Sequence, residues 1–173
     1  QAVGMGRDFF EASETAREVF QAADRVLGID LSGVCFNGPE DRLNQTDFSQ
    51  PAIYVTSVAC FRALVAAAKL DEAAVACCAG LSLGEYTALH LAGAIGFEEG
   101  LRLVAARGRH MQEASTAVPS GMVALVGADE AAAESICAEA AAGEVLAPAN
   151  FNSPGQIVIS GAAGACQRAA ALA

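Results

Sequence analysis

Apolar residues recur every three or four positions along much of the chain, which is the spacing of helices that bury one face. This spacing predicts a first helix from Gly6 to Leu27, and Gly28 fits its end. The segment from Asp30 to Phe36 predicts a short helix or turn, and the polar stretch from Asn37 to Gln50 predicts a loop. Further helices are predicted over Ser49–Ala68, Gly84–Gly93 and Phe97–Ser115.

One short apolar run does not fit a helix. Residues Ala73 to Ala79 are small and apolar, and the run is too short for a core helix, so it predicts a buried parallel strand. A helix follows this strand directly, and that alternation predicts a layered α/β fold. Thr116 to Gly121, which contains Pro119, predicts a linker.

Beyond this linker the pattern changes to short strands and alanine-rich helices. Strands are predicted over Met122–Val126, Val145–Ala149 and Gln156–Ser160, with helices over Asp129–Ala142 and from Ala162 onward. The order β-α-β-β-α is one strand short of a ferredoxin-like unit.

Composition narrows the class of protein. The chain has 173 residues, 54% of them hydrophobic and 17% charged, so it can bury a real core and is not disordered. Ten basic and 20 acidic residues give a net charge of −10, which argues against a nucleic-acid or anionic-membrane partner. We find no uninterrupted apolar run that spans a bilayer and no secretory leader, so we expect a cytoplasmic location. The chain stops inside a helical pattern, which predicts that it is part of a longer polypeptide.

The six cysteines are predicted to be buried, reduced thiols. No CxxC pair is present, and four of the six lie in apolar or alanine-rich runs. Neither histidine is paired with cysteine or carboxylate residues at ligand spacing, so we expect no metal site.

The sharpest local motif is Gly80-Leu81-Ser82-Leu83-Gly84, between the predicted strand and the next helix. A G-x-S-x-G motif in that context is typical of a nucleophile elbow, with Ser82 exposed on a tight turn and the Leu83 N–H available to an oxyanion. The same residues also form an S-x-x-E capping box with Glu85, which needs no chemistry. Both interpretations are open at this point.

A serine nucleophile needs a base, and the chain offers only His90 and His110. His90 lies eight residues along the helix, about 12 Å from Ser82 at the standard helical rise. His110 lies beside the charged face of the following helix. We therefore predict that both are packing or surface residues and that any base lies outside this chain.

Arg107 is the second candidate. At about 100° per residue, the charged residues of the helix Phe97–Ser115 gather on one arc and its apolar residues on the opposite arc. Arg107 falls among the apolar residues, between Leu103 and Met111. A buried guanidinium needs an anionic partner, which is either a carboxylate of the protein or a carboxylate of a ligand. Alternatively, the aliphatic stem of Arg107 lets its charged end reach the edge of the helix.

These motifs together resemble the malonyl-CoA:acyl carrier protein transacylase family and the related acyltransferase domains of fatty-acid and polyketide synthases. The resemblance covers the whole chain and is carried by Gln1–Gly6, Gln50-Pro51-Ala52, Gly80–Tyr86, Arg107-Gly108, Met111-Gln112 and Asn150–Gln156. One departure is Leu81, where the family usually has histidine, and this leaves the polar contacts near the acyl group in question.

The resemblance implies a hydrolase-like parallel-sheet core with an inserted ferredoxin-like subdomain, both incomplete here, over residues 1–118 and 119–173. It implies that Ser82 accepts the acyl group, Leu83 serves the oxyanion hole, and Arg107 with Met111 binds the substrate. The second oxyanion donor, a glutamine, would lie just before Gln1, and the general-base histidine would lie beyond Ala173. No cofactor is implied, since the coenzyme A thioester is a substrate.

The implied reaction transfers malonyl from coenzyme A to Ser82 and then to the phosphopantetheine thiol of acyl carrier protein, as in fatty acid biosynthesis, by a monomeric enzyme. Because that partner and this chain are both acidic, docking needs a local basic patch, for which Arg102 and Arg109 are candidates. The alternatives are a polyketide synthase domain, an α/β-hydrolase esterase in which Arg107 has no ligand role, and a structural fragment in which Ser82 is only a cap.

Overall fold

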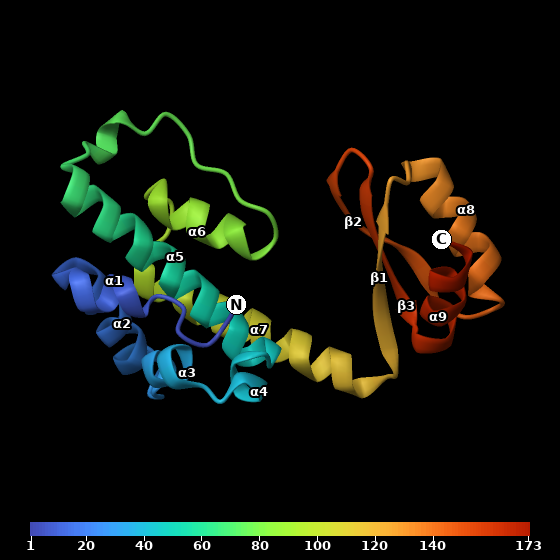
Figure 1. Cartoon of the computed structure of the whole chain (residues 1–173), viewed down its shortest axis with the longest axis horizontal. Helices are drawn as coiled ribbons and strands as arrows, with labels where there is room; N and C mark the ends of the chain where they lie inside the picture. The colour runs from blue at the N-terminus through green and yellow to red at the C-terminus, as the bar shows by residue number, and fades with distance from the viewer. The chain divides into compact units, whose positions relative to one another are not determined.

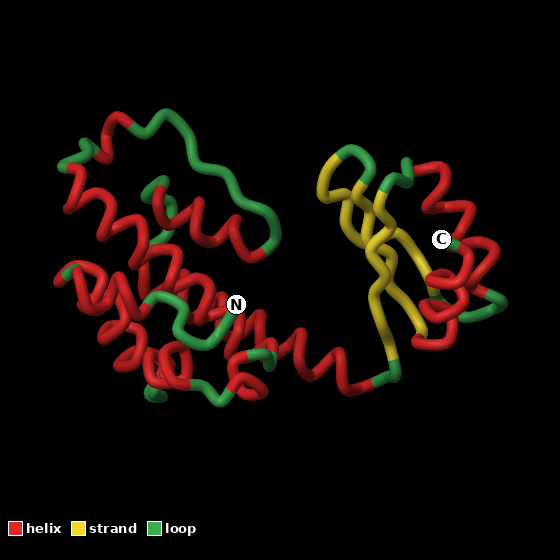
Figure 2. Tube along the Cα trace, viewed as in Figure 1, coloured by secondary structure: helices red, strands yellow, loops and turns green.

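The computed structural model describes all 173 residues, which form two compact units, Gln1–Gln112 and Glu113–Ala173. The first unit is helical and the second is a small sheet with two helices (Figures 1 and 2). The elements are α1 (Arg7–Ala12), α2 (Glu14–Leu27), α3 (Leu31–Asn37), α4 (Glu40–Leu43), α5 (Thr46–Ala68), the 3-10 helix η1 (Glu72–Ala74), α6 (Leu83–Leu91), α7 (Phe97–Ala117), β1 (Ser120–Val126), α8 (Glu130–Ala141), β2 (Leu146–Ser153), β3 (Gln156–Ala162) and α9 (Ala163–Leu172).

Helix α5 supplies most of the core of the first unit. Its apolar residues are spread around the helix and not gathered on one side, and Tyr54, Val55 and Ala59 are fully buried. By length and composition alone this helix could cross a membrane, although polar residues and Arg62 interrupt its apolar sequence. Here its buried side chains pack with those of α2, α3 and α7.

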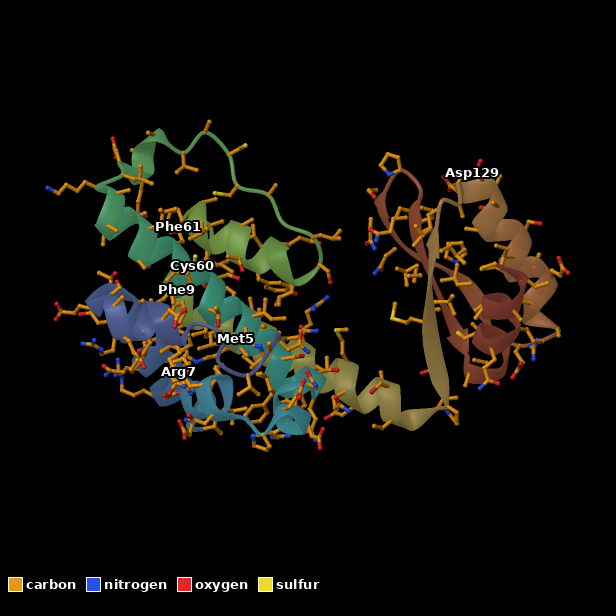
Figure 3. The ribbon with its side chains drawn as sticks, viewed as in Figure 1. Met5, Arg7, Phe9, Cys60, Phe61 and Asp129 are labelled. Atoms are coloured by element: carbon orange, nitrogen blue, oxygen red, sulfur yellow. The ribbon has the colours of Figure 1, made fainter.

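The predicted helix from Gly6 to Leu27 is two helices. Ser13 adopts an extended conformation between α1 and α2, and its hydroxyl accepts the N–H of Ala16 at 3.3 Å, which is the geometry of a helix N-cap. The apolar spacing continues across this break, so periodicity alone misses it. The segment before α1 is held by Met5, which packs against the core. Arg7, the first residue of α1, donates to Phe36 O and Asn37 Oδ1. Figure 3 labels both side chains on this part of the chain.

The predicted loop from Asn37 to Gln50 contains more structure than expected. Helix α4 lies within it, and α5 begins at Thr46 rather than Ser49. The remaining helices of the first unit are confirmed with shifts of one or two residues at their ends, and α7 continues through Ala117 into the predicted linker.

The predicted buried strand from Ala73 to Ala79 is wrong. The structure has η1 at its start and irregular backbone after it (Figure 2). Val75, in this segment, is 46% exposed. A strand needs a neighbour to bond its N–H and C=O groups, and all three strands of the described chain pair with one another in the second unit. The sheet is therefore antiparallel, and the fold is mixed α/β without the expected parallel sheet.

All six cysteines are free thiols, but only Cys35, Cys137 and Cys166 are buried. Cys77 is exposed because the segment expected to bury it is not a strand. Burial, followed by the nearby carboxylates of Asp24 and Asp30, raises the pKa of the Cys35 thiol to about 12.

In the second unit, β3 is the central strand and pairs antiparallel with both β1 and β2. Helices α8 and α9 cover one face of this sheet, where Leu125, Ile157 and Ile159 are buried (Figure 1). The alternation along β1 leaves Met122 and Val126 exposed. The predicted order of strands and helices beyond the linker is confirmed.

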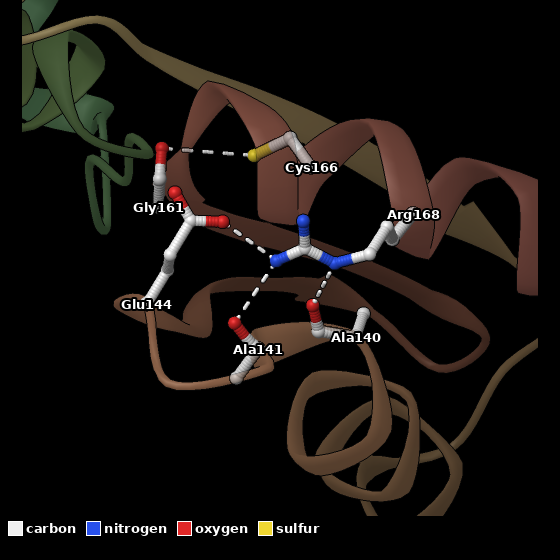
Figure 4. A network of polar contacts seen from close by, with 6 residues as sticks. All are labelled: Ala140, Ala141, Glu144, Gly161, Cys166 and Arg168. Carbon is white, nitrogen blue, oxygen red and sulfur yellow. Dashed lines mark hydrogen bonds and ion pairs between the residues drawn. The ribbon is translucent and has the colours of Figure 1, made fainter.

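An arginine closes the end of α8. Arg168 donates from Nε to Ala140 O at 2.7 Å and from Nη2 to Ala141 O at 3.0 Å, and Nη2 also pairs with Glu144 at 2.6 Å (Figure 4). The last carbonyls of a helix have no partner within it, so this guanidinium serves as their cap.

Candidate active site

Ser82 occupies a sharp turn immediately before α6. Its backbone has φ 56° and ψ −105°, a conformation that costs a residue with a side chain on the order of 1–3 kcal/mol. The turn is so tight that a Cβ on Gly80 would lie 2.1 Å from the carbonyl group of Gly84. This is the strained, glycine-dependent geometry of a nucleophile elbow.

The start of α6 supplies two further parts of the motif. Oε1 of Glu85 accepts the backbone N–H of Ser82 at 2.9 Å, so the glutamate arm of the predicted capping box is present. Leu83 is the first residue of α6, where a backbone N–H has no carbonyl to bond within the helix. That N–H is suited to an oxyanion formed at Ser82.

Arg107 of α7 reaches Ser82 directly. Its Nη2 donates to Ser82 Oγ at 2.6 Å, and its Nη1 donates to Oε1 of Gln50 at 2.5 Å. The guanidinium carbon lies 5.9 Å from the centre of the Tyr86 ring. The two residues that the sequence singled out independently, Ser82 and Arg107, are therefore hydrogen-bonded to each other within the first unit.

The partners of Arg107 argue against a structural ion pair. A structural ion pair requires a carboxylate of the protein, but the hydrogen-bond partners of Arg107 are a hydroxyl and an amide, both neutral. The charge of this half-buried guanidinium is thus not offset by an anion of the chain. The arrangement favours an anionic ligand.

Gln50 is a site residue that sequence reasoning did not single out, beyond its place in the Gln50-Pro51-Ala52 motif. It is only 7% exposed, and its Nε2 contacts the sulfur of Met111 at 3.0 Å. The available signal was an amide directly before the apolar stretch that begins at Pro51. Met111 itself is 44% exposed beside this cluster.

His90 packs away from Ser82, as predicted. Its Nδ1 lies 3.2 Å from Ile95 O, and its ring contacts Tyr54 and Phe97. His110 lies on the exposed side of α7. Among the 173 described residues, no three His, Cys, Asp or Glu side chains gather into a group that could hold a metal ion.

Comparison with known proteins gives consistent matches over the whole chain. The family model described as the acyl transferase domain matches residues 1–172. The malonyl CoA-acyl carrier protein transacylase of Escherichia coli strain K12 is 43% identical over 171 residues, which is 99% of this chain and 54% of that protein. The chain thus spans about half the length of the curated relatives it matches.

Solved structures agree with this sequence relationship. The acyl-carrier-protein-S-malonyltransferase of Bartonella henselae superposes with a TM-score of 0.91 at 40% identity, covering 100% of this chain and 55% of that one. A malonyl-transacylase solved in complex with a type II polyketide acyl carrier protein superposes with a TM-score of 0.88 at 41% identity, covering 98% and 54%.

Proposed function

The chain belongs to the acyl transferase domain family, and from that premise we propose that it carries the acyl-accepting serine and the acid-selecting arginine of a malonyl-CoA:acyl carrier protein transacylase. The observation that carries this proposal is the 2.6 Å contact between Ser82 Oγ and Arg107 Nη2. A malonyl thioester has one methylene between its reacting carbonyl carbon and its carboxylate. Because Ser82 Oγ and the Arg107 guanidinium are in contact, one acyl group as short as malonyl can place its carbonyl carbon beside Ser82 and its carboxylate on Arg107.

In the proposed first step, the malonyl carboxylate takes the place of Ser82 Oγ on the Arg107 guanidinium. This frees the hydroxyl and brings the thioester carbonyl beside it. Ser82 Oγ then attacks the carbonyl carbon, its proton passes to a base supplied from outside this chain, and the Leu83 N–H stabilises the oxyanion. The carbon–sulfur bond breaks, and coenzyme A leaves as its thiol once protonated.

In the second step, the phosphopantetheine thiol of acyl carrier protein attacks the malonyl-serine ester. A new thioester forms, the ester bond breaks, and the proton returns to Ser82. The relatives named as transacylases support this pairing of donor and acceptor. The exposed Met111 is proposed to line the acyl site beside Arg107.

The same family membership supports the finer architecture that the sequence implied, a hydrolase-like core over residues 1–118 and part of a ferredoxin-like subdomain over 119–173. The six free thiols support a cytoplasmic enzyme.

Intact-mass analysis after incubation with malonyl-CoA tests the proposal, on the chain joined to the sequence that flanks it in its natural polypeptide. We expect one malonyl adduct, which is lost in Ser82→Ala. Arg107→Ala is expected to lose about 100-fold or more in kcat/KM for malonyl-CoA while acetyl-CoA is used as well as before or better, because the carboxylate then has no partner. An esterase would hydrolyse the malonyl adduct, and its activity would not change in Arg107→Ala. A structural fragment would form no malonyl adduct. The 173-residue chain by itself is expected to turn over poorly.

A further inference from the structure

Gln50 has an environment that requires explanation. Ser49 and Gln50 are the two buried polar side chains among the 173 described residues, and a buried amide costs stability unless its groups are hydrogen-bonded. Both ends of the Gln50 amide are used, because Oε1 accepts from Arg107 and Nε2 faces the weakly accepting sulfur of Met111. This pair of contacts fixes the amide orientation, since only the oxygen can accept from a guanidinium.

The backbones of α5 and α7 are in contact at this point. A Cβ on Gly108 would lie 2.7 Å from Thr46 O and 3.2 Å from the Cα of Asp47. One turn further along α7, Oε1 of Gln112 accepts the N–H of Thr46 at 2.9 Å. The spacing between Gln50 and the base of the Arg107 side chain is therefore set by the main chain.

We propose that Gln50 is a positioning residue that holds Arg107 for the carboxylate of the acyl group and thereby sets the preference for dicarboxylic over monocarboxylic acyl thioesters. This inference rests on the proposed function. Gln50 holds the guanidinium through Nη1, while Nη2 exchanges Ser82 Oγ for the substrate carboxylate. Gln50 itself contacts neither the nucleophile nor the reacting carbon.

The Gln50 amide carries no charge, which distinguishes the way Arg107 is held from the way Arg168 is held. Arg168, which has a structural role, is held by the carboxylate of Glu144 and two carbonyls, so its charge is compensated. Arg107 is held by an amide, which fixes its direction and leaves its full charge for a ligand. A carboxylate at position 50 would compete with the substrate for the same cation.

The test compares Gln50→Ala and Gln50→Glu with the control Ser49→Ala, which changes a neighbouring buried polar residue. Activity with malonyl-CoA and with acetyl-CoA is measured on the chain joined to the sequence that flanks it in its natural polypeptide. We expect Gln50→Ala to lower kcat/KM for malonyl-CoA by about tenfold or more, mainly through KM, and to change acetyl-CoA use by less than about threefold. Gln50→Glu keeps the size of the side chain and is expected to lose the malonyl preference at least as strongly as Gln50→Ala. Thermal unfolding of Gln50→Glu checks that this variant is folded. Ser49→Ala is expected to keep it.

A double-mutant cycle separates positioning from general packing. If Gln50 acts only through Arg107, adding Gln50→Ala to Arg107→Ala changes the malonyl-to-acetyl ratio by less than about twofold. Additive effects in the cycle, or a wild-type ratio in folded Gln50→Glu, overturn the role of Gln50 and leave the proposed function standing. Absence of a malonyl adduct on wild-type Ser82 overturns the proposed function itself, and the role of Gln50 with it.

Discussion

The two glycines of the elbow motif are not equivalent, and this can be tested by adding one methyl group to each. A Cβ on Gly80 would lie 2.1 Å from both the carbonyl carbon and oxygen of Gly84 and 2.7 Å from the nitrogen of Glu85. These are backbone atoms, so no side chain can move aside and the turn has to open. A Cβ on Gly84 meets nothing within 4 Å, and Gly84 lies in the first turn of α6.

We expect Gly80→Ala to lower the free energy of unfolding by about 1–3 kcal/mol, the usual cost of overpacking. Gly84→Ala is expected to be neutral or stabilising by up to about 1 kcal/mol, since alanine favours a helix. Opening the turn by about 1 Å moves Ser82 from Arg107 and is expected to cost about 100-fold in the rate of malonyl-serine formation. Urea unfolding and the acylation rate measure the two effects. Equal stability and equal acylation in the two variants would refute this account of the elbow.

Two further predictions concern stability away from Ser82. Burial, then Asp24 and Asp30, raises the pKa of Cys35 from 9.0 to about 12, and burial raises that of Tyr54 to about 12. Because both groups stay protonated in the folded state while the unfolded chain ionises, the free energy of unfolding is expected to fall from about pH 9 to pH 12, by at most about 1.4 kcal/mol per pH unit for each proton. In urea titrations, Cys35→Ala should reduce the slope of the free energy of unfolding against pH to the part that Tyr54 contributes. An unchanged slope would contradict the contribution of Cys35. Arg168→Ala is expected to speed amide hydrogen exchange in α8, because the carbonyls of Ala140 and Ala141 lose their donor. Arg168→Lys should restore only part of the protection, since a single ammonium group cannot reproduce the several donors of a guanidinium. Unaltered exchange in Arg168→Ala would count against the role of Arg168 as a helix cap.

The sequence predicted helices well where their ends carry local signals. The break at Ser13 was missed, because the apolar spacing runs through it and the cap is visible only once the backbone turns. Helix α4 was missed because it is short and lies in a polar stretch. The strand expected over Ala73–Ala79 failed for a different reason. Its apolar composition is real, but a strand is stabilised by its neighbours, and no other strand of this chain lies beside it.

The candidate site was predictable in its types of residue and less so in its contacts. A serine between two glycines and an arginine on an apolar face are local exceptions to the pattern of their elements, so both stand out in one dimension. Their mutual contact depends on how α6 and α7 pack, which no periodicity contains. Gln50 was noted only as part of a family motif, because a glutamine at the end of a polar stretch does not break the local pattern, while its importance comes from a partner 57 residues away.

The accuracy of this site depends more on backbone contact than on hydrogen bonds. Gln50 comes from α5, Ser82 from the turn before α6 and Arg107 from α7. Glycines stand at two places where the backbone near these residues approaches itself closely. A Cβ would lie 2.1 Å from the carbonyl group of Gly84 at Gly80 and 2.7 Å from Thr46 O at Gly108. Neither of these glycines has a positive φ, so glycine is required there for space and not for conformation. Long side chains such as Arg107 and Gln50 lose considerable rotamer freedom when fixed, and close backbone contacts restrict where their bases lie before any ligand binds. A site built in this way should be more sensitive to one added methyl group at these glycines than to the loss of a single surface ion pair.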